Sequence, residues 1–201
     1  EKGEVMFDFS GRTPWSQATS FSTKGRSMTS ADGRYLALIA TRHDEATRTR
    51  NVYGLVVLDV KDKRIVGTLD AKNFPRPGAS PDYVSASPSG RHVVVSWPGD
   101  AGGTRVYTRD LTDSFELPTT SKHADMAYGP QKQDYYVFAD YSKNQLSATD
   151  LDSHERIDLR SLYPANGENY TLDISGQAYD KPGWAVVSTY GERSEERRVG
   201  K

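Results

Sequence analysis

The chain has 201 residues, of which 35% are hydrophobic and 26% are charged, and its formal net charge is −1. This composition fits a globular β protein better than a disordered chain. The near-zero net charge gives no electrostatic basis for binding nucleic acid or an anionic membrane surface. The chain has no cysteine, which excludes disulfides and thiolate metal sites. No apolar run approaches the ~20 residues needed to cross a bilayer, so we expect no membrane span.

The N-terminal region is expected to hold one strand and one loop. Glu4–Phe9 alternates apolar and polar residues, which favours a strand, and Arg12–Lys24 is a Ser/Thr-rich stretch that favours a loop around Trp15. We assign residues 1–22 to this strand and loop. The strand can serve as the outer strand of a structural unit other than the ones that follow.

A first unit of four antiparallel strands is expected over residues 23–70. The expected strands are Arg26–Thr29, Tyr35–Ala40, Val52–Val60 and Arg64–Leu69. Tyr35–Ala40 is nearly all apolar, which indicates burial on both faces. Thr41–Asn51 is polar and charged, and we interpret it as a surface loop.

The same order of strands and turns recurs along the chain. We place a second unit at 80–118, a third at 122–160 and a partial fourth at 170–190. The expected strands of the second unit are Tyr83–Ser87, His92–Trp97, Thr104–Asp110 and Ser114–Leu117. Those of the third are His123–Tyr128, Asp134–Ala139, Gln145–Asp150 and Glu155–Leu159, and those of the fourth are Tyr170–Ile174 and Trp184–Tyr190.

An aspartate near the end of each third strand gives the register of the repeat. These residues are Asp59, Asp110 and Asp150, each followed by an apolar residue and then a turn. A short carboxylate side chain can accept hydrogen bonds from the backbone of the turn that follows it, so we interpret these aspartates as turn residues rather than ligands. Units of about 40–50 residues with four strands each are typical of a β-propeller. The sequence therefore predicts an all-β fold, an incomplete β-propeller with about three to four blades present.

Two stretches carry a family resemblance. Ser87–Trp97 reads SPSGRHVVVSW and Ser30–Ala40 reads SADGRYLALIA. Both resemble the Ser-Pro-Asp-Gly-(Lys/Arg) turn and apolar strand of the WD40-like, TolB-type propeller repeats of bacteria. The resemblance implies the propeller fold and leaves the function open. The chain departs from the signature at Ser89, which replaces Asp, and at Gly129–Asp134, where the third copy has Gly-Pro-Gln-Lys-Gln-Asp.

The C-terminal tail interrupts the fourth unit where a third strand is due. Residues 191–201 are strongly charged, and Arg193–Lys201 resembles translated adapter sequence at the end of a metagenomic reading frame. We therefore expect the tail not to be native and the natural protein to continue beyond Tyr190.

Candidate site residues lie where the inner strands of the units begin, because loops at that end of a propeller line the mouth of its central channel. The candidates are Arg26, Asp82, Tyr83, His123, Asp125, Tyr170 and Asp173. His123 and Asp125 are two residues apart and share one face of a strand. This pair suits a hydrogen-bond network between blades, a ligand site, or an acid/base or metal pair.

A second, more distant resemblance concerns oligogalacturonate lyases. Ser121–Asp125 and Lys181–Ser188 are similar to stretches of those propellers, which hold a divalent metal through several histidines. The resemblance implies a metal at His123 and Asp125, with Arg26 pairing with a substrate carboxylate. The chain departs from it because Asp173 stands where a further histidine is expected, and because the remaining histidines lie elsewhere. His43 and His154 are expected in loops, and His92 at the start of a second strand.

The sequence thus favours a non-enzymatic binding or interaction propeller, bacterial and exported to the periplasm or the outside of the cell. Its partner would be a protein or a carbohydrate, and no cofactor is expected. The alternative is a metal-dependent lyase acting on oligogalacturonate-like polysaccharides.

Overall fold

A computed structural model describes most of the chain between Ser20 and Tyr190. The described residues are 20–22, 29–44, 46–77, 79–97, 103–117, 124–129, 131–140, 145–161, 171–175 and 186–190. The strands expected at Glu4–Phe9 and Arg26–Thr29 lie outside these ranges, except for Thr29, and so does the tail at 191–201. Within the described residues, no helix is long and apolar enough to cross a membrane.

The described strands form three four-stranded antiparallel sheets and one two-stranded ladder, and in each sheet the strands are paired in chain order. Sheet 1 consists of β1 (Ser20–Ser22), β2 (Tyr35–Asp44), β3 (Thr49–Asp59) and β4 (Arg64–Asp70). Sheet 2 consists of β5 (Tyr83–Ala86), β6 (His92–Ser96), β7 (Thr104–Thr108) and β8 (Ser114–Leu117). Sheet 3 consists of β9 (Ala124–Tyr128), β10 (Asp134–Asp140), β11 (Gln145–Asp150) and β12 (Arg156–Ser161). The ladder consists of β13 (Thr171–Ser175) and β14 (Val186–Tyr190), and a 3₁₀ turn, η2 (Ala71–Asn73), follows β4.

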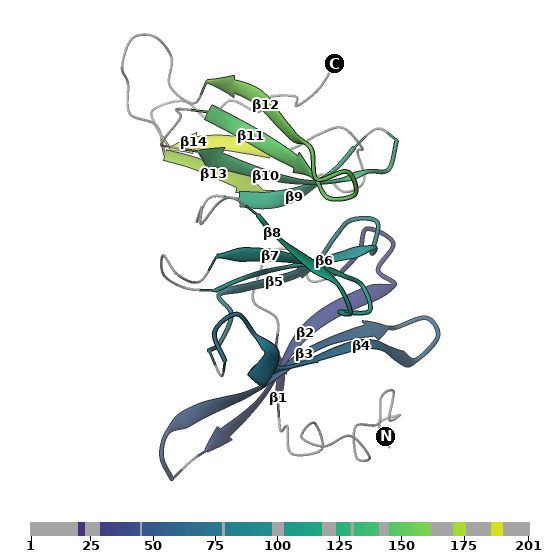
Figure 1. The fold of residues 1–201 in the computed structure, drawn as a ribbon, viewed down its shortest axis with the longest axis vertical. Coiled ribbons are helices and arrows are strands. Elements are labelled where there is room, and N and C mark those ends of the chain that lie inside the picture. Colours follow the sequence, from purple (N-terminus) through teal and green to yellow (C-terminus); the bar gives the residue numbers. More distant parts are fainter. Residues whose placement is uncertain are drawn as a thin grey trace.

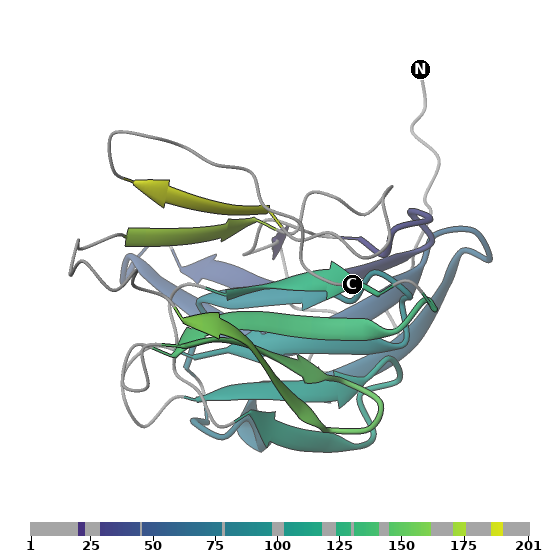
Figure 2. The ribbon, with the colours of Figure 1, turned by 90° about the horizontal axis from the view of Figure 1, so that it is seen from above.

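The three sheets are stacked one above another, with sheet 1 lowest and sheet 3 highest (Figure 1). Seen from above, the strands of neighbouring sheets overlie one another in layers (Figure 2). Consecutive four-stranded meanders stacked in this way are consistent with part of a β-propeller, and the described sheets do not close into a ring. The expected all-β class is confirmed, and so is the expected order of strands in sheets 2 and 3.

The core lies between the sheets because the middle strands are apolar on both faces. Val93 and Val95 of β6 face sheet 1, where they join Ile39 and Leu55 in one cluster. Val94 faces sheet 3 and belongs to a second cluster. The members of that cluster from sheet 3 are Met126, Tyr136, Phe138 and Leu151. All three valines are fully buried, and each such side chain contributes about 1.5–3 kcal/mol by leaving water.

The aspartates of the third strands hold the turns, as the sequence indicates. The backbone N–H of Asp62 donates to Oδ1 of Asp59 at 3.1 Å, and that of Thr112 donates to Oδ1 of Asp110 at 3.3 Å. Oδ1 of Asp150 accepts from two backbone N–H groups, those of Asp152 and Ser153, at 2.8 and 2.9 Å. The interpretation as turn residues is confirmed.

Asp59 has a second role that the sequence does not indicate. Its side chain is fully buried, and the guanidinium of Arg34 donates to both carboxylate oxygens at 2.8 to 3.1 Å. These hydrogen bonds outweigh the effect of burial and lower the pKa of Asp59 to about 2. The ion pair therefore joins Arg34, in the turn before β2, to Asp59, at the end of β3.

Two expectations for sheet 1 need correction. The stretch Thr41–Asn51 is not a loop throughout, because β2 continues to Asp44 and β3 already begins at Thr49. The stretch Arg12–Lys24 is not a loop throughout, because β1 (Ser20–Ser22) pairs with Ile39–Thr41 of β2. Phe21 explains this strand physically, because it packs against the apolar cluster on that face of β2 and β3. Of the strand expected at Arg26–Thr29 the structure describes Thr29, which makes a single bridge to Leu36.

Candidate functional site

Equivalent turns of the three sheets meet at one end of the stack. The backbone N–H of Ala31 in sheet 1 donates to the carbonyl of Pro88 in sheet 2 at 2.8 Å. Ser89 of sheet 2 donates its backbone N–H to Asp134 at the start of β10 at 2.9 Å. The sheets are therefore stacked in the same orientation, and the starts of β5 and β9 lie together at the opposite end.

At that opposite end, a hydrogen bond joins two of the predicted site residues. The hydroxyl of Tyr83 in β5 donates to Oδ1 of Asp125 in β9 at 3.2 Å, and the backbone N–H of Met126 donates to the same oxygen at 2.8 Å. Asp125 is only 1% exposed. Its carboxylate is thus placed between sheets 2 and 3 and is held there by hydrogen bonds.

Further polar groups extend this contact between the two sheets. Tyr136 of β10 is buried, and burial raises the pKa of its hydroxyl to about 12 although Thr104 and Ser96 hydrogen-bond to it. The hydroxyls of Ser96 and Thr104 are themselves 2.7 Å apart. A phenol with so high a pKa stays protonated at neutral pH, so it serves as a hydrogen-bonding group and not as a base.

The side chain of Asp82 is exposed, whereas that of its neighbour Tyr83 is half-buried. The backbone N–H of Asp82 donates to the carbonyl of Ser96 at 2.8 Å, which fixes its position at the start of β5. Trp97, which follows β6 and belongs to the core cluster between sheets 1 and 2, packs edge-to-face against Phe74 with ring centroids 5.4 Å apart.

The remaining predicted site residues are not brought into this group by the described part of the structure. Arg26, His123 and Tyr170 lie outside the described residues. Asp173 lies in β13, where its backbone is paired with Ser188. Among the described residues, no group of three or more His, Asp or Glu side chains is arranged to hold a metal ion. Tyr83 and Asp125 are therefore the two candidates whose side chains the structure brings together.

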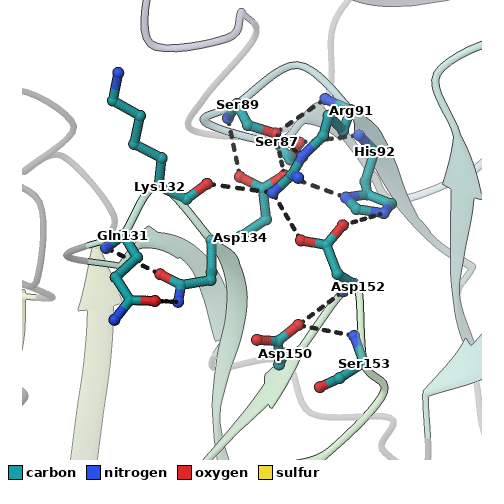
Figure 3. A network of polar contacts seen from close by, with 11 residues as sticks. Ser87, Ser89, Arg91, His92, Gln131, Lys132, Asp134, Asp150, Asp152 and Ser153 are labelled. Carbon is teal, nitrogen blue, oxygen red and sulfur yellow. Dashed lines mark hydrogen bonds and ion pairs between the residues drawn. The ribbon is translucent and has the colours of Figure 1, made fainter.

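The end of the stack where the turns meet holds a second polar network, which sequence reasoning missed (Figure 3). Asp134 is fully buried at its centre. The backbone N–H and the hydroxyl of Ser89 both donate to it, and Nδ1 of His92 lies 3.1 Å from Oδ2. Burial by itself would raise the pKa of Asp134, but hydrogen bonds from His92, Ser89 and Ser87 outweigh it and hold that pKa below its usual range.

A second carboxylate completes this network. Asp152 lies on the other side of the His92 ring, with Oδ1 3.6 Å from Nε2. The guanidinium of Arg91 donates to Asp152 at 2.7 Å and to the carbonyl of Lys132 at 3.2 Å. Two residues of one turn in sheet 2 thus contact two separate turns of sheet 3.

The network contains serine, histidine and aspartate, but its geometry is not that of a nucleophile. The Ser89 hydroxyl donates to Asp134, and that of Ser87 accepts from the backbone N–H of His92 at 3.0 Å. An activated serine needs a base that takes its hydroxyl proton, with the acid on the far side of that base. Here both the serine and the histidine bind the same carboxylate, which suits a contact that holds two sheets together.

One signal in the sequence could have pointed to Asp134. Aligned on the repeat, Tyr35, His92 and Asp134 occupy the same position at the start of the second strand. The turn of sheet 2 has Ser89 where the signature has Asp, and the carboxylate that its backbone binds comes from Asp134 of the next sheet. The second repeat lacks the aspartate of its turn, because Ser89 stands there, and the third repeat has an additional aspartate, Asp134. Together these two departures could have indicated the contact.

Comparisons of the chain with family models and with curated proteins find no match. Among solved structures it is similar to TolB-type and other β-propeller proteins. The propeller domain of the Trilobed protease from Pyrococcus furiosus is 10% identical, with a TM-score of 0.45 over 92% of this chain and 58% of that chain. TolB from Acinetobacter baumannii is 12% identical, with a TM-score of 0.44 over 89% and 40%. A putative TolB from Agrobacterium tumefaciens is 14% identical, with a TM-score of 0.43 over 90% and 62%. The chain thus spans less than two thirds of each of these structures.

Proposed function

We propose that the chain forms part of a non-catalytic, incomplete β-propeller that binds a protein or carbohydrate ligand at the end of the stack where the inner strands begin. The observation that carries this proposal is the contrast between Asp125 and Asp82. Asp125 is buried and hydrogen-bonded to Tyr83, whereas Asp82 is exposed at the same end. The buried acid contributes to cohesion between sheets, and the exposed acid is available to a ligand.

A lyase mechanism would require some of these residues to bind a metal ion. It requires His123, Asp125 and Asp173 to hold a metal ion together. Of these three side chains the structure describes that of Asp125, whose Oδ1 already accepts two hydrogen bonds. A buried carboxylate in this position is a poor candidate for an exchangeable metal ligand, so binding is the function we propose.

We also propose that the protein works in the periplasm or outside the cell. The support is the resemblance of its turn-and-strand repeats to those of exported bacterial propellers. Fractionation of cells that express the protein from its genomic reading frame tests this, and recovery in the cytoplasm would contradict it.

The proposed site is tested by calorimetric titration of the protein with oligogalacturonates and with neutral xylo-oligosaccharides. Asp82→Ala is the test variant. Glu155→Ala is the matched control, because Glu155 is an exposed acid in the turn between β11 and β12, at the other end of the stack. We expect Asp82→Ala to weaken binding by about tenfold or more, since a hydrogen bond to a charged group contributes about 1.5–3 kcal/mol, and Glu155→Ala to leave it unchanged.

The same samples are followed by ultraviolet absorbance, with and without divalent metal, for the unsaturated product of a lyase. We expect no rise. A metal-dependent rise would contradict the non-catalytic proposal. Equal affinities of Asp82→Ala and wild type for a probe that the wild type binds would show that the site lies elsewhere.

A further inference from the structure

The hairpin of β2 and β3 extends beyond the rest of sheet 1. β1 pairs with β2 only at Ile39–Thr41, and β4 pairs with β3 only at Gly54–Asp59, whereas β2 and β3 stay paired as far as Asp44 and Thr49. The hairpin is drawn as a two-stranded ribbon that projects from the lower part of the molecule (Figure 1). We call residues 42–44 and 46–51 the arm.

The local sequence explains why the arm leaves the sheet. The pairing of β2 with β3 shifts register between Ala40 and Thr41, and Gly54 opposite this shift has a φ of 155°. Such bulges bend a strand pair and increase its twist, which turns the ribbon away from the flanking strands. Beyond the bulge the side chains of Arg42, His43 and Asn51 are exposed. The arm is therefore polar because both of its faces meet solvent.

Two arginines of the arm, Arg42 and Arg48, differ from the other arginines whose side chains the structure describes, because their side chains have no partner among the described residues. Arg42 and Arg48 are exposed, and neither has an ion pair or hydrogen bond within the described part of the chain. The other arginines with described side chains are engaged. Arg34, Arg64, Arg91, Arg105 and Arg156 form ion pairs, Arg109 lies over the ring of Tyr35, and Arg76 has a contact of its own.

The arm also offers backbone groups. Among the described strands, none pairs with the outer edge of β2 at residues 42–44 or with that of β3 at residues 49–53. Unpaired strand edges are templates to which an extended polypeptide can add as a further strand. Exposed arginines on such an edge discourage pairing with neutral or basic strands and favour a strand that carries acidic side chains.

We propose that the arm is a docking surface for an extended, acidic segment of a partner protein, which adds as a strand to one edge of the ribbon and pairs its carboxylates with Arg42 and Arg48. This surface is separate from the ligand site at Asp82. In sequence, residues 42–51 also include Arg50, Asp44 and Glu45, so their net charge is small and the attraction is local to Arg42 and Arg48. The backbone hydrogen bonds give the partner its orientation, and the arginines select its charge.

The test uses the whole chain and a fluorescein-labelled synthetic peptide that alternates glutamate and valine, with binding followed by fluorescence anisotropy. The double variant Arg42→Glu/Arg48→Asn removes both charges; asparagine suits position 48, where φ is 54°. The single variant Arg42→Glu is compared with Lys61→Glu, which makes the same charge change at an exposed turn in the same sheet.

We expect the peptide to bind the wild type and to bind the double variant about tenfold more weakly, because two exposed charge pairs contribute up to about tenfold together. Lys61→Glu is expected to bind as the wild type does. A peptide methylated on alternate backbone nitrogens is expected to lose binding, and added salt to weaken it. Equal binding by Arg42→Glu and Lys61→Glu, equal binding of the methylated peptide, or no binding of the peptide would overturn the proposal.

Two further arms of the experiment distinguish other occupants. If soluble polygalacturonate displaces the peptide as effectively as unlabelled peptide does, the surface recognises an acidic polysaccharide and the proposal of a protein strand is wrong. If Asp82→Ala abolishes peptide binding and the arm variants do not, the peptide occupies the ligand site. That result would overturn the arm and leave the proposed function intact.

Discussion

Gly90 in the turn between β5 and β6 is the position where one added methyl group should perturb the stacking of sheets 1 and 2 most clearly. Its φ is +72°, a backbone angle that residues other than glycine rarely adopt, and a Cβ there would overlap with the ring of Tyr35 from sheet 1. Gly33 occupies the equivalent turn of sheet 1 with a φ of +70°, but a Cβ there meets nothing within 4 Å. Comparing Gly33→Ala with Gly90→Ala therefore separates the free energy lost to backbone strain from that lost to the steric overlap with Tyr35.

The magnitudes follow from these two environments. The left-handed backbone costs a non-glycine residue about 1–2 kcal/mol, so Gly33→Ala should lower the free energy of unfolding by that amount. Gly90→Ala should lower it by about 2–5 kcal/mol, because overpacking adds about 1–3 kcal/mol. The ring of Tyr35 cannot move away freely, since it is 8% exposed and the guanidinium of Arg109 lies 4.3 Å from its centroid.

Urea unfolding followed by tryptophan fluorescence measures both variants, and the background variant Tyr35→Leu supplies the control. In that background the extra cost of Gly90→Ala over Gly33→Ala should shrink, because the overlapping ring is absent. If Gly90→Ala costs no more than Gly33→Ala in the wild-type background, the close contact between the turn of sheet 2 and the Tyr35 ring does not stabilise the stack.

Three further perturbations concern single contacts. Gly67→Ala should destabilise the protein by about 1–3 kcal/mol, because a Cβ at Gly67 would lie 2.5 Å from the backbone C and O of Asp110 in the next sheet; thermal unfolding measures it, and a neutral effect would contradict the close approach. The carboxyl of Asp59, followed by NMR, should titrate at a pKa of about 2 and move toward 3.8 in Arg34→Gln. Because that pKa is lowered on folding, the stability that Asp59 contributes should be present above about pH 4 and be lost as the pH falls through about 2; an unchanged pKa in Arg34→Gln would show that Arg34 does not cause the low pKa. Asp134→Asn should cost about 1–3 kcal/mol in urea unfolding, since it leaves buried donors without their acceptor, and a cost near zero would show that the carboxylate does not join the sheets.

The fold could be predicted from the sequence wherever its signal is local. The run from Val93 to Val95 is apolar on both faces, and the structure buries it between two sheets. The aspartates before the turns accept hydrogen bonds from residues two or three positions away. Patterns of this kind depend on a few neighbouring residues, so they can be recognised in a single chain.

The arm shows where such patterns mislead. Polarity between Thr41 and Asn51 indicates exposure, and exposure by itself favours a loop. A ribbon that is solvated on both faces has no buried side to create an alternating pattern, so its strands look like a loop in sequence. The register shift at Ala40/Thr41, which makes the ribbon project, leaves no mark that composition can reveal.

The candidate site could be predicted only in part, because its contacts join residues far apart in the chain. Tyr83 and Asp125 are both candidates because of their place at the start of inner strands, but their separation of 42 positions gives no sign that they bind each other. Ser89 and Asp134 are 45 positions apart and are not among the predicted site residues. Contacts of this kind arise when one sheet is stacked on the next, and they depend on a register between sheets that a single sequence does not encode locally.

The hydrogen bond between Tyr83 and Asp125 decides most directly whether this end of the stack is built for cohesion or for chemistry. A double-mutant cycle with Tyr83→Phe and Asp125→Asn, measured by urea unfolding, gives the coupling energy of the pair. We expect a coupling of about 1.5–3 kcal/mol, the contribution of a hydrogen bond to a charged group. A coupling near zero, with Asp125→Asn as stable as the wild type, would contradict a structural role for Asp125 and reopen a catalytic one.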